Sequence, residues 1–228
     1  MIVLAIETAT REGSVAVVQE GVTRASRAGD AARPHATRLP GDALDALAEC
    51  GLAMGDVSLI AVCLGPGAFT GLRVGIATAQ GLAFAASKPI VGISALEALA
   101  LAVLAEAEAG QVAGVWMDAA RGEVFAARYR RGVDEPTGLC LADEPVSAPP
   151  DVVAARWRGD GPTVTRWIGD GAERYQTFLP VDARVEPRPL IAPLVGRLAD
   201  LRRSEAGTPH ALRPLYVRPP DAELARRR

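Results

Sequence analysis

The feature that most constrains the fold of this chain is an internal repeat. The segments AIETATREGSVAV, from Ala5, and WMDAARGEVFA, from Trp116, share one plan: an apolar strand, an acidic residue, a turn of small residues, Arg, Gly and a second strand. Further along, CLGPG and WIGDG each end an apolar run in Gly-x-Gly and lead toward a helix. Two matched features in the same order indicate two copies of one unit. We place the boundary near Gly110, which gives lobes of residues 1–109 and 110–228.

Strand-like and helix-like patterns alternate in both halves. IVLAI reads as a buried strand, and SVAVVQEGVTRAS reads as a hairpin that turns at Glu20 and Gly21. The helical spacing near Leu39 predicts a helix, which Pro40 could either interrupt or leave continuous. Ser94 followed by Glu97 has the spacing of a capping box that opens a helix. With 49% hydrophobic residues, the chain is predicted to be an α/β protein in which each lobe is a mixed sheet with helices.

Composition excludes several classes of protein. The formal net charge of −2 and the 4% of aromatic residues offer neither a large basic surface nor a stacking platform for nucleic acid. Cys50, Cys63 and Cys140 are widely separated, which is typical of reduced thiols in the cytoplasm rather than of a disulfide framework or zinc site. The residues before the first strand show no signal-peptide pattern, and we expect no membrane-spanning segment because no apolar run reaches the required length. We therefore expect a cytoplasmic protein.

The repeated plan resembles the actin, sugar-kinase and heat-shock-chaperone superfamily. That resemblance implies two ribonuclease-H-like lobes, with ATP phosphates held in a cleft by the first hairpin of each lobe. Glycines permit close approach of a backbone, and exposed amides at helix starts favour an anion. The residues that would form such a cleft are Glu7, Thr8, Gly65, Gly67, Asp118, Gly169 and Gly171.

Details of these motifs argue against phosphate binding. GPGAFTG lacks the Gly-Lys-Ser/Thr ending of a P-loop, and its glycines do not form Gly-x-Gly-x-x-Gly. The first hairpin has Glu7 followed by Thr8, Ala9, Thr10 and Arg11, where superfamily ATPases commonly have Asp, Gly and hydroxyl residues. For Glu7 and Asp118, capping or turn structure is favoured over ligand contact. We interpret the cleft as vestigial.

A finer resemblance extends over essentially the whole chain. The segments LAIETAT, GPGAFTGLRVGIATAQGLAFA, PIVGISALEALA, MDAARGEVFAARY, GDGAERY and PLYVRPP match the TsaB family, also called YeaZ, in order and spacing. The resemblance implies a noncatalytic subunit that binds and activates TsaD, which transfers threonylcarbamoyl to the adenosine next to the anticodon of tRNA. It further implies TsaE in the assembled complex, a homodimer when TsaD is absent, and tRNA contact only through the complex. ATP or ADP with Mg would then occur only in the complex, and the chain would have no cofactor of its own.

The histidines of this chain do not match those of a metal-dependent transferase. An enzyme of the TsaD type carries two histidines four positions apart on a helix, which places both rings on one face. Here the only histidines are His35 and His210, and the fourth residue after His35 is Leu39. We predict no metal ligand and no catalytic residue. Two other functions remain open: an ATP-dependent phosphotransferase of sugar-kinase type, and a metallopeptidase-like protein, against which the missing histidine pair argues.

Small residues recur every four positions in the helix that follows GPGAF. Gly71, Gly75, Ala79 and Ala83 form one stripe and would let another element approach closely. The pattern alone fits a helix packed against its own sheet as well as it fits a helix presented to a partner. The resemblance to TsaB favours the partner, so we predict that Gly71, Leu72, Gly75, Ala79 and Ala83 form the interface with TsaD. Thr70 is the predicted cap of this helix.

Overall fold

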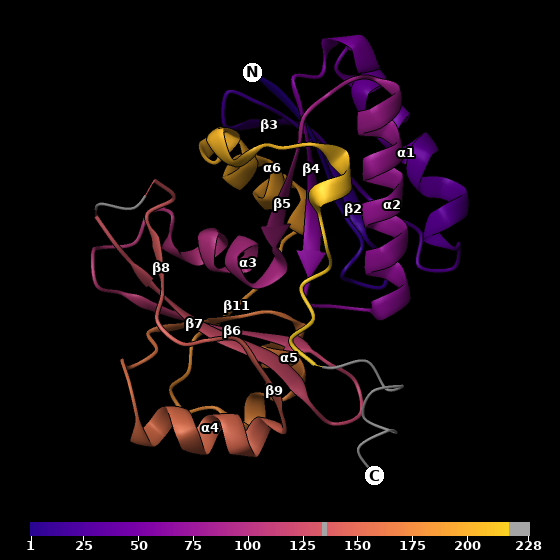
Figure 1. Ribbon diagram of the computed structural model, residues 1–228. Helices are drawn as coiled ribbons and strands as arrows, with labels where there is room; N and C mark the ends of the chain where they lie inside the picture. Colours follow the sequence, from indigo (N-terminus) through magenta and orange to yellow (C-terminus); the bar gives the residue numbers. More distant parts are fainter. Residues whose placement is uncertain (134–135, 219–228) are drawn as a thin grey trace. The chain divides into compact units, whose positions relative to one another are not determined.

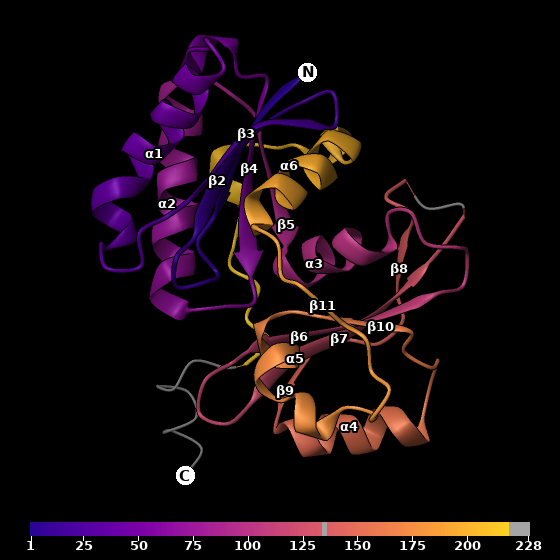
Figure 2. The ribbon, with the colours of Figure 1, turned by 180° about the vertical axis from the view of Figure 1, so that it is seen from behind.

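The structure is a computed structural model that describes residues 1–133 and 136–218. It divides the chain into two compact units. Unit 1 contains residues 1–102 and 189–214, and unit 2 contains residues 103–188 together with the segment from Leu215 onward. Each unit is described by itself (Figures 1 and 2). No helix among the described residues is both long enough and apolar enough to span a lipid bilayer.

Unit 1 is built on a five-stranded mixed sheet in the order β3-β2-β1-β4-β5. The antiparallel part consists of β1 (Ile2–Glu7), β2 (Ser14–Gln19) and β3 (Val22–Ala28), and the parallel part adds β4 (Leu59–Gly65) and β5 (Ile90–Ser94). The predicted hairpin turn is confirmed at Glu20 and Gly21, where both residues have positive φ values. Such a turn matches the right-handed twist of the paired strands.

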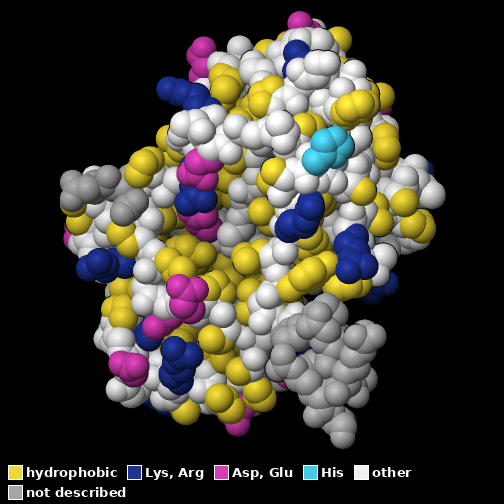
Figure 3. All heavy atoms as spheres, viewed as in Figure 1, with side chains coloured by type: hydrophobic (Ala, Val, Ile, Leu, Met, Phe, Trp, Pro, Cys, Tyr) yellow, Lys and Arg dark blue, Asp and Glu magenta, His cyan; other side chains and the backbone are white. Residues whose placement is uncertain are grey.

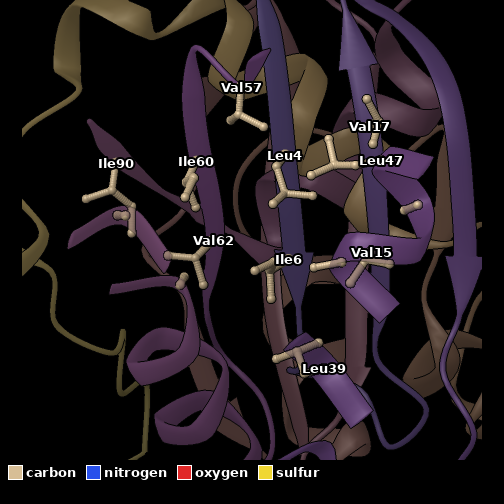
Figure 4. Close-up of a cluster of buried hydrophobic side chains, with 14 of the residues drawn as sticks. Leu4, Ile6, Val15, Val17, Leu39, Leu47, Val57, Ile60, Val62 and Ile90 are labelled. Carbon is tan, nitrogen blue, oxygen red and sulfur yellow. The ribbon is translucent and has the colours of Figure 1, made fainter. Parts of the chain in front are cut away.

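Helices cover both faces of this sheet (Figure 1). The helices α1 (His35–Glu49) and α2 (Phe69–Ala85) pack on one face, and α6 (Ile191–Leu201) packs on the other. Alternate residues of β1 and β2 point toward α1 and α2, where Leu4, Ile6, Val15 and Val17 meet Leu39 and Leu47 (Figure 4). The other face of β1 and β2 meets α6, whose Gly196 lies close to Ala5 and Val18. Unit 1 also includes η1 (Met54–Asp56), most of α3 (Ala95–Leu104), η3 (Arg203–Glu205) and η4 (Pro209–Ala211).

Unit 2 has the same strand topology. Its sheet has the order β11-β10-β6-β7-β8, from β6 (Val112–Asp118), β7 (Val124–Arg131), β8 (Leu139–Leu141), β10 (Arg166–Ile168) and β11 (Val185–Glu186), and β9 (Val146–Ala148) pairs with β7. The helical elements are α4 (Pro150–Gly159), α5 (Asp170–Arg174) and η2 (Gln176–Phe178). Trp116, Trp157 and Trp167 pack together in its core, with ring centroids 5.3 to 5.9 Å apart.

The internal repeat predicted from the sequence is present in this topology. In each unit the first strand pairs antiparallel with the second strand and parallel with the strand that leads into Gly-x-Gly. The units differ from the predicted lobes of residues 1–109 and 110–228 at two segments, 103–109 and 189–214. The second segment belongs to unit 1 because α6 buries Ile191, Leu194 and Val195 against the first sheet.

The structure decides one open question about the helices, corrects one prediction and confirms another. Pro40 does not break α1, which is continuous from His35 to Glu49, since the buried Leu39 and Leu47 hold the helix on the sheet on both sides of the proline. Thr70 does not cap α2, because the helix already begins at Phe69 and Ala68 is the capping residue. Ser94 does cap α3, where the Glu97 N–H donates to its hydroxyl at 3.5 Å.

Candidate functional sites in the two units

The turn between β1 and β2 is held together by the carboxylate of Glu7. The Thr10 N–H donates to one carboxylate oxygen at 2.7 Å, and the hydroxyls of Ser14 and Thr10 donate to the other at 2.8 and 3.2 Å. Ser14 in turn accepts the N–H of Ala192 at the start of α6, at 3.1 Å. Glu7 is 1% exposed, and burial raises its pKa although the hydrogen bonds favour the ionised form. Glu7 therefore stabilises the turn between β1 and β2, in agreement with the turn structure that the sequence favoured for it.

The Gly-Pro-Gly loop packs directly on this turn. The Ala68 N–H donates to the Ala9 carbonyl at 3.1 Å. A Cβ on Gly67 would lie 2.6 Å from Ala9 Cα, and Gly65 has φ of 104°. Both glycines are thus required by a close backbone approach and an unusual dihedral. Thr8, on the same turn, is fully buried, and its hydroxyl has no hydrogen-bond partner among the residues that the structure describes.

A buried arginine fixes the turn from the side of α1. Arg38 is 3% exposed, and its guanidinium pairs with Asp42 and donates to the Glu12 carbonyl. It also lies 2.8 Å from His35 Nδ1. Burial, and secondarily the charge of Arg38, lowers the pKa of His35. His35 is therefore a structural contact of the first turn of α1.

The corresponding site in unit 2 is also a structural turn. Asp118 ends β6, and its N–H donates to Asp170 at 3.0 Å. The Asp118 carboxylate accepts the Ala120 N–H at 3.0 Å and pairs with Arg174 at 2.7 Å. Burial raises the pKa of Asp170, which also accepts the N–H of Gly171 at 3.0 Å. A Cβ on Gly171 would lie 2.8 Å from the carbonyl carbon of Met117.

Gly169 also has no room for a side chain, because its φ is 112° and an added Cβ would lie 2.9 Å from the Trp116 carbonyl carbon. In unit 2, as in unit 1, the glycines let the loop lie on the end of the first strand. Across residues 1–133 and 136–218, no group of three or more His, Cys, Asp or Glu side chains is arranged to hold a metal ion.

The predicted interface stripe is buried inside unit 1, so the prediction that it faces a partner needs correction. Gly71, Leu72, Gly75, Ala79 and Ala83 are all buried residues of α2. A Cβ on Gly71 would lie 2.5 Å from the Thr8 carbonyl oxygen, and one on Gly75 would overlap Thr8 Oγ1. The small residues therefore bring α2 close to the end of β1, and no partner helix can reach them.

The opposite face of α2 is exposed, and the sequence reasoning missed it. Phe84 is 70% exposed and Phe69 is 40% exposed, while the Arg73 guanidinium lies 3.9 Å from the centroid of the Phe69 ring. Ala77 and Gly81 lie between them on the same exposed face, and nothing lies within 4 Å of a Cβ built on Gly81. On α1, Leu44 is 51% exposed. The space-filling view shows hydrophobic side chains exposed over this part of unit 1 (Figure 3).

We call Phe69, Arg73, Ala77, Gly81 and Phe84 the exposed α2 face. Two phenylalanines fifteen residues apart on one helix were visible in the sequence. However, apolar residues occur all around α2, so the pattern did not indicate which of them faces the core.

The two units define the class of this protein: paired mixed sheets with helices, related by an internal repeat, as in the actin and sugar-kinase superfamily. Residues 28–144 match the family model described as TsaD, tRNA N6-adenosine threonylcarbamoyltransferase. The TsaB protein of Escherichia coli is 34% identical over 178 residues, which cover 76% of each chain. The solved structure of YeaZ from Pseudomonas aeruginosa superposes with a TM-score of 0.76 at 32% identity, covering 94% of this chain and 99% of that one.

The chain belongs to the TsaB family. A related protein of Mycobacterium leprae is 35% identical over 97% of this chain, but this chain spans only 56% of that relative's length.

Proposed function

We propose that this protein is a noncatalytic subunit that binds and activates a TsaD-type transferase in the synthesis of threonylcarbamoyladenosine on tRNA. The role in this pathway follows from the relatives named tRNA threonylcarbamoyladenosine biosynthesis protein TsaB. TsaE in an assembled complex, a homodimer in the absence of TsaD, and contact with tRNA only through the complex are parts of the same proposal. The proposal also includes that this chain has no cofactor of its own.

The observation that carries the proposal is the exposed α2 face. Phe69 and Phe84 are exposed on one side of the same helix, and aromatic residues commonly dominate the interfaces between proteins, which supports this side of α2 as a binding surface. Ala77 and Gly81 leave room between Phe69 and Phe84 for the backbone of a partner helix. This face replaces the buried stripe as the proposed interface with TsaD.

The two turns support a noncatalytic role. The carboxylates of Glu7 and Asp118 are occupied by hydroxyls, amides or an arginine of their own unit. The Thr10 and Gly13 amides of the first turn donate to Glu7 and to Thr10 Oγ1, so neither is available to a phosphate. These contacts favour a binding subunit over the alternative of a sugar-kinase-type phosphotransferase.

The test is the substitution Gly81→Leu, which adds bulk at the centre of the exposed α2 face. It should leave the fold intact because the position is open, and leucine has a higher helix propensity than glycine by nearly 1 kcal/mol. Assembly with the cognate transferase, measured by light scattering, should be lost, and the mixture should fail to modify tRNA. Gly159→Leu is the matched control, because Gly159 also lies in a helix with nothing within 4 Å of an added Cβ, but in unit 2. A folded Gly81→Leu protein that assembles like the control would refute the proposed interface.

A further inference from the structure

A C-terminal segment of unit 1, residues 206–214, lies against α2, and we call it the strap. Gly207 forms an isolated bridge with Ile90 of β5, with N–H to carbonyl distances of 2.9 and 3.1 Å. The Gln80 side chain donates to the Pro209 carbonyl at 2.7 Å, and the His210 ring lies 6.2 Å from the Phe84 ring. Leu212 packs against the hydrophobic core. The strap is therefore held in place at both ends and in its middle.

The strap borders the exposed α2 face. α1 and η4 of the strap both pack against α2, on different sides of it (Figure 1). Gln80 and Phe84 both contact the strap and are neighbours one turn apart on the same side of α2, and Phe84 is also the neighbour of Gly81 on the exposed α2 face. A partner helix with its side chains is about 10 Å wide, so a helix seated over Gly81 must also touch the strap. His210 is exposed there beside Phe84.

The charge of this combined surface has a single sign. Neither α2 nor the strap contains an Asp or Glu residue, whereas they carry Arg73 and Arg213. Arg213 is exposed and donates to the carbonyls of His210 and Leu212 in its own strap, at 2.8 and 2.9 Å. The acidic residues on the neighbouring part of α1, Asp45 and Glu49, pair with Arg27. The surface thus carries apolar side chains along α2, one arginine, Arg73, within the exposed α2 face, and a second arginine, Arg213, on the strap at its edge.

We propose that the strap is a second element of the partner-binding surface, and that it selects a partner whose contacting helix is apolar with carboxylates at its edge. This inference rests on the proposed function, since the partner is the TsaD-type transferase. Complementary charge at the rim of an interface accelerates association and excludes partners of the wrong charge. Arg213 supplies the charge, and the ring pair of Phe84 and His210 supplies a contact fixed before binding.

The experiment is calorimetric titration of the cognate transferase into the full chain at low and at high ionic strength. Arg213→Glu should weaken binding by about tenfold at low ionic strength, and the loss should shrink at high ionic strength because salt screens exposed charges. Arg213→Lys keeps the charge and should bind like the wild type. His210→Ala should weaken binding at both ionic strengths by about the same factor, since its contribution is packing. Arg24→Glu on β3, the far edge strand from β5, is the matched charge control and should have no effect.

The outcomes separate this inference from the function on which it rests. If Gly81→Leu abolishes binding while Arg213→Glu and His210→Ala bind within twofold of the wild type, the strap is not part of the surface and the inference is overturned. If Arg213→Lys loses as much affinity as Arg213→Glu, the charge is not what matters, and the inference is again overturned. If the wild-type chain does not bind the transferase at all, the proposed function itself fails. Circular dichroism of each variant checks that the strap substitutions leave the fold intact.

Discussion

Two glycines of α2 provide a matched pair for testing how closely the helix packs on β1. Gly75 is buried, and a Cβ there would overlap the Thr8 hydroxyl and lie 3.1 Å from Thr8 Cβ and Cγ2. Gly81 is exposed, with nothing within 4 Å of an added Cβ. Both positions are inside the same helix, so alanine brings the same gain in helix propensity, up to about 1 kcal/mol. The difference between the two variants therefore measures the packing alone.

The expected magnitude follows from these contacts. Carbon atoms pack best at about 3.5–4.0 Å, and forcing an extra methyl group into a filled core costs about 1–3 kcal/mol. Thr8 cannot turn away into solvent because it is fully buried. Gly75→Ala should therefore lower the free energy of unfolding by about 1–2 kcal/mol after the propensity gain, whereas Gly81→Ala should raise it by up to about 1 kcal/mol. For a chain of this size each kcal/mol corresponds to about 2–4 °C in Tm.

The assay is thermal and urea unfolding followed by two signals. All three tryptophans, Trp116, Trp157 and Trp167, lie in unit 2, so their fluorescence reports on unit 2, while circular dichroism reports on both units. The loss in Gly75→Ala should be seen in the circular dichroism transition. The loss of stability caused by Gly75→Ala should be smaller when Thr8 is also replaced by alanine, because the overlapping hydroxyl is then gone. The coupling free energy between the two substitutions should be about 1 kcal/mol or more.

A Gly75→Ala protein as stable as Gly81→Ala, with no coupling to Thr8→Ala, would refute the close packing of α2 on β1. It would also reopen the interpretation that the small-residue stripe faces a partner.

Three further predictions concern the buried polar groups and the turns. Burial raises the pKa of Glu7 above its ordinary value of 4.5. Glu7 therefore contributes fully to the free energy of unfolding below pH 4.5, and this contribution is lost as the pH rises through the pKa of the folded state. Glu7→Gln should remove this pH dependence from the free energy of unfolding measured with urea. Glu97→Ala removes the buried partner of Arg202 and leaves this partly exposed guanidinium only its 3.7 Å contact with the exposed Glu205, so it should cost about 1–3 kcal/mol. An equal loss in Glu205→Ala would contradict this. The chain purified without partners should not hydrolyse ATP, and turnover that Asp118→Ala abolishes would show that the turn of unit 2 is catalytic.

The repeat and the succession of its main strands along the chain were predictable because both are visible in short-range sequence patterns. Apolar runs that end in Glu7 and Asp118, and the glycines that follow β4 and β10, mark the same positions in each unit. The sequence associated the glycines at these positions with close approach to a phosphate, whereas Gly67 and Gly171 lie close to the backbone of Ala9 and Met117 in their own unit. Such features depend on residues close together in sequence, so a single chain displays them without any knowledge of tertiary contacts.

The location of α6 was not predictable in the same way. The helix lies in the second half of the chain, yet it packs on the sheet of unit 1, where the Ala192 N–H reaches the Ser14 hydroxyl across 178 positions of sequence. The apolar spacing of residues 191–201 indicates that one face is buried, but not which sheet buries it. The same gap in information affects the strap, because its contacts with Gln80 and Phe84 join residues more than a hundred positions apart.

The error about α2 has a definite physical origin. Two glycines four positions apart indicate that some group approaches the helix closely. The need for small side chains is the same whether that group is Thr8 of the same unit or a helix of another protein. Deciding between them needs the direction of the apolar face, and α2 has apolar residues on all sides. The exposed residues supply the missing criterion: a helix that only packed on its own sheet would not need Phe84 exposed, whereas a helix that binds on both sides needs small residues inside and aromatic residues outside. On this reasoning the proposed interface stays on α2 but moves from the buried stripe of small residues to the exposed α2 face.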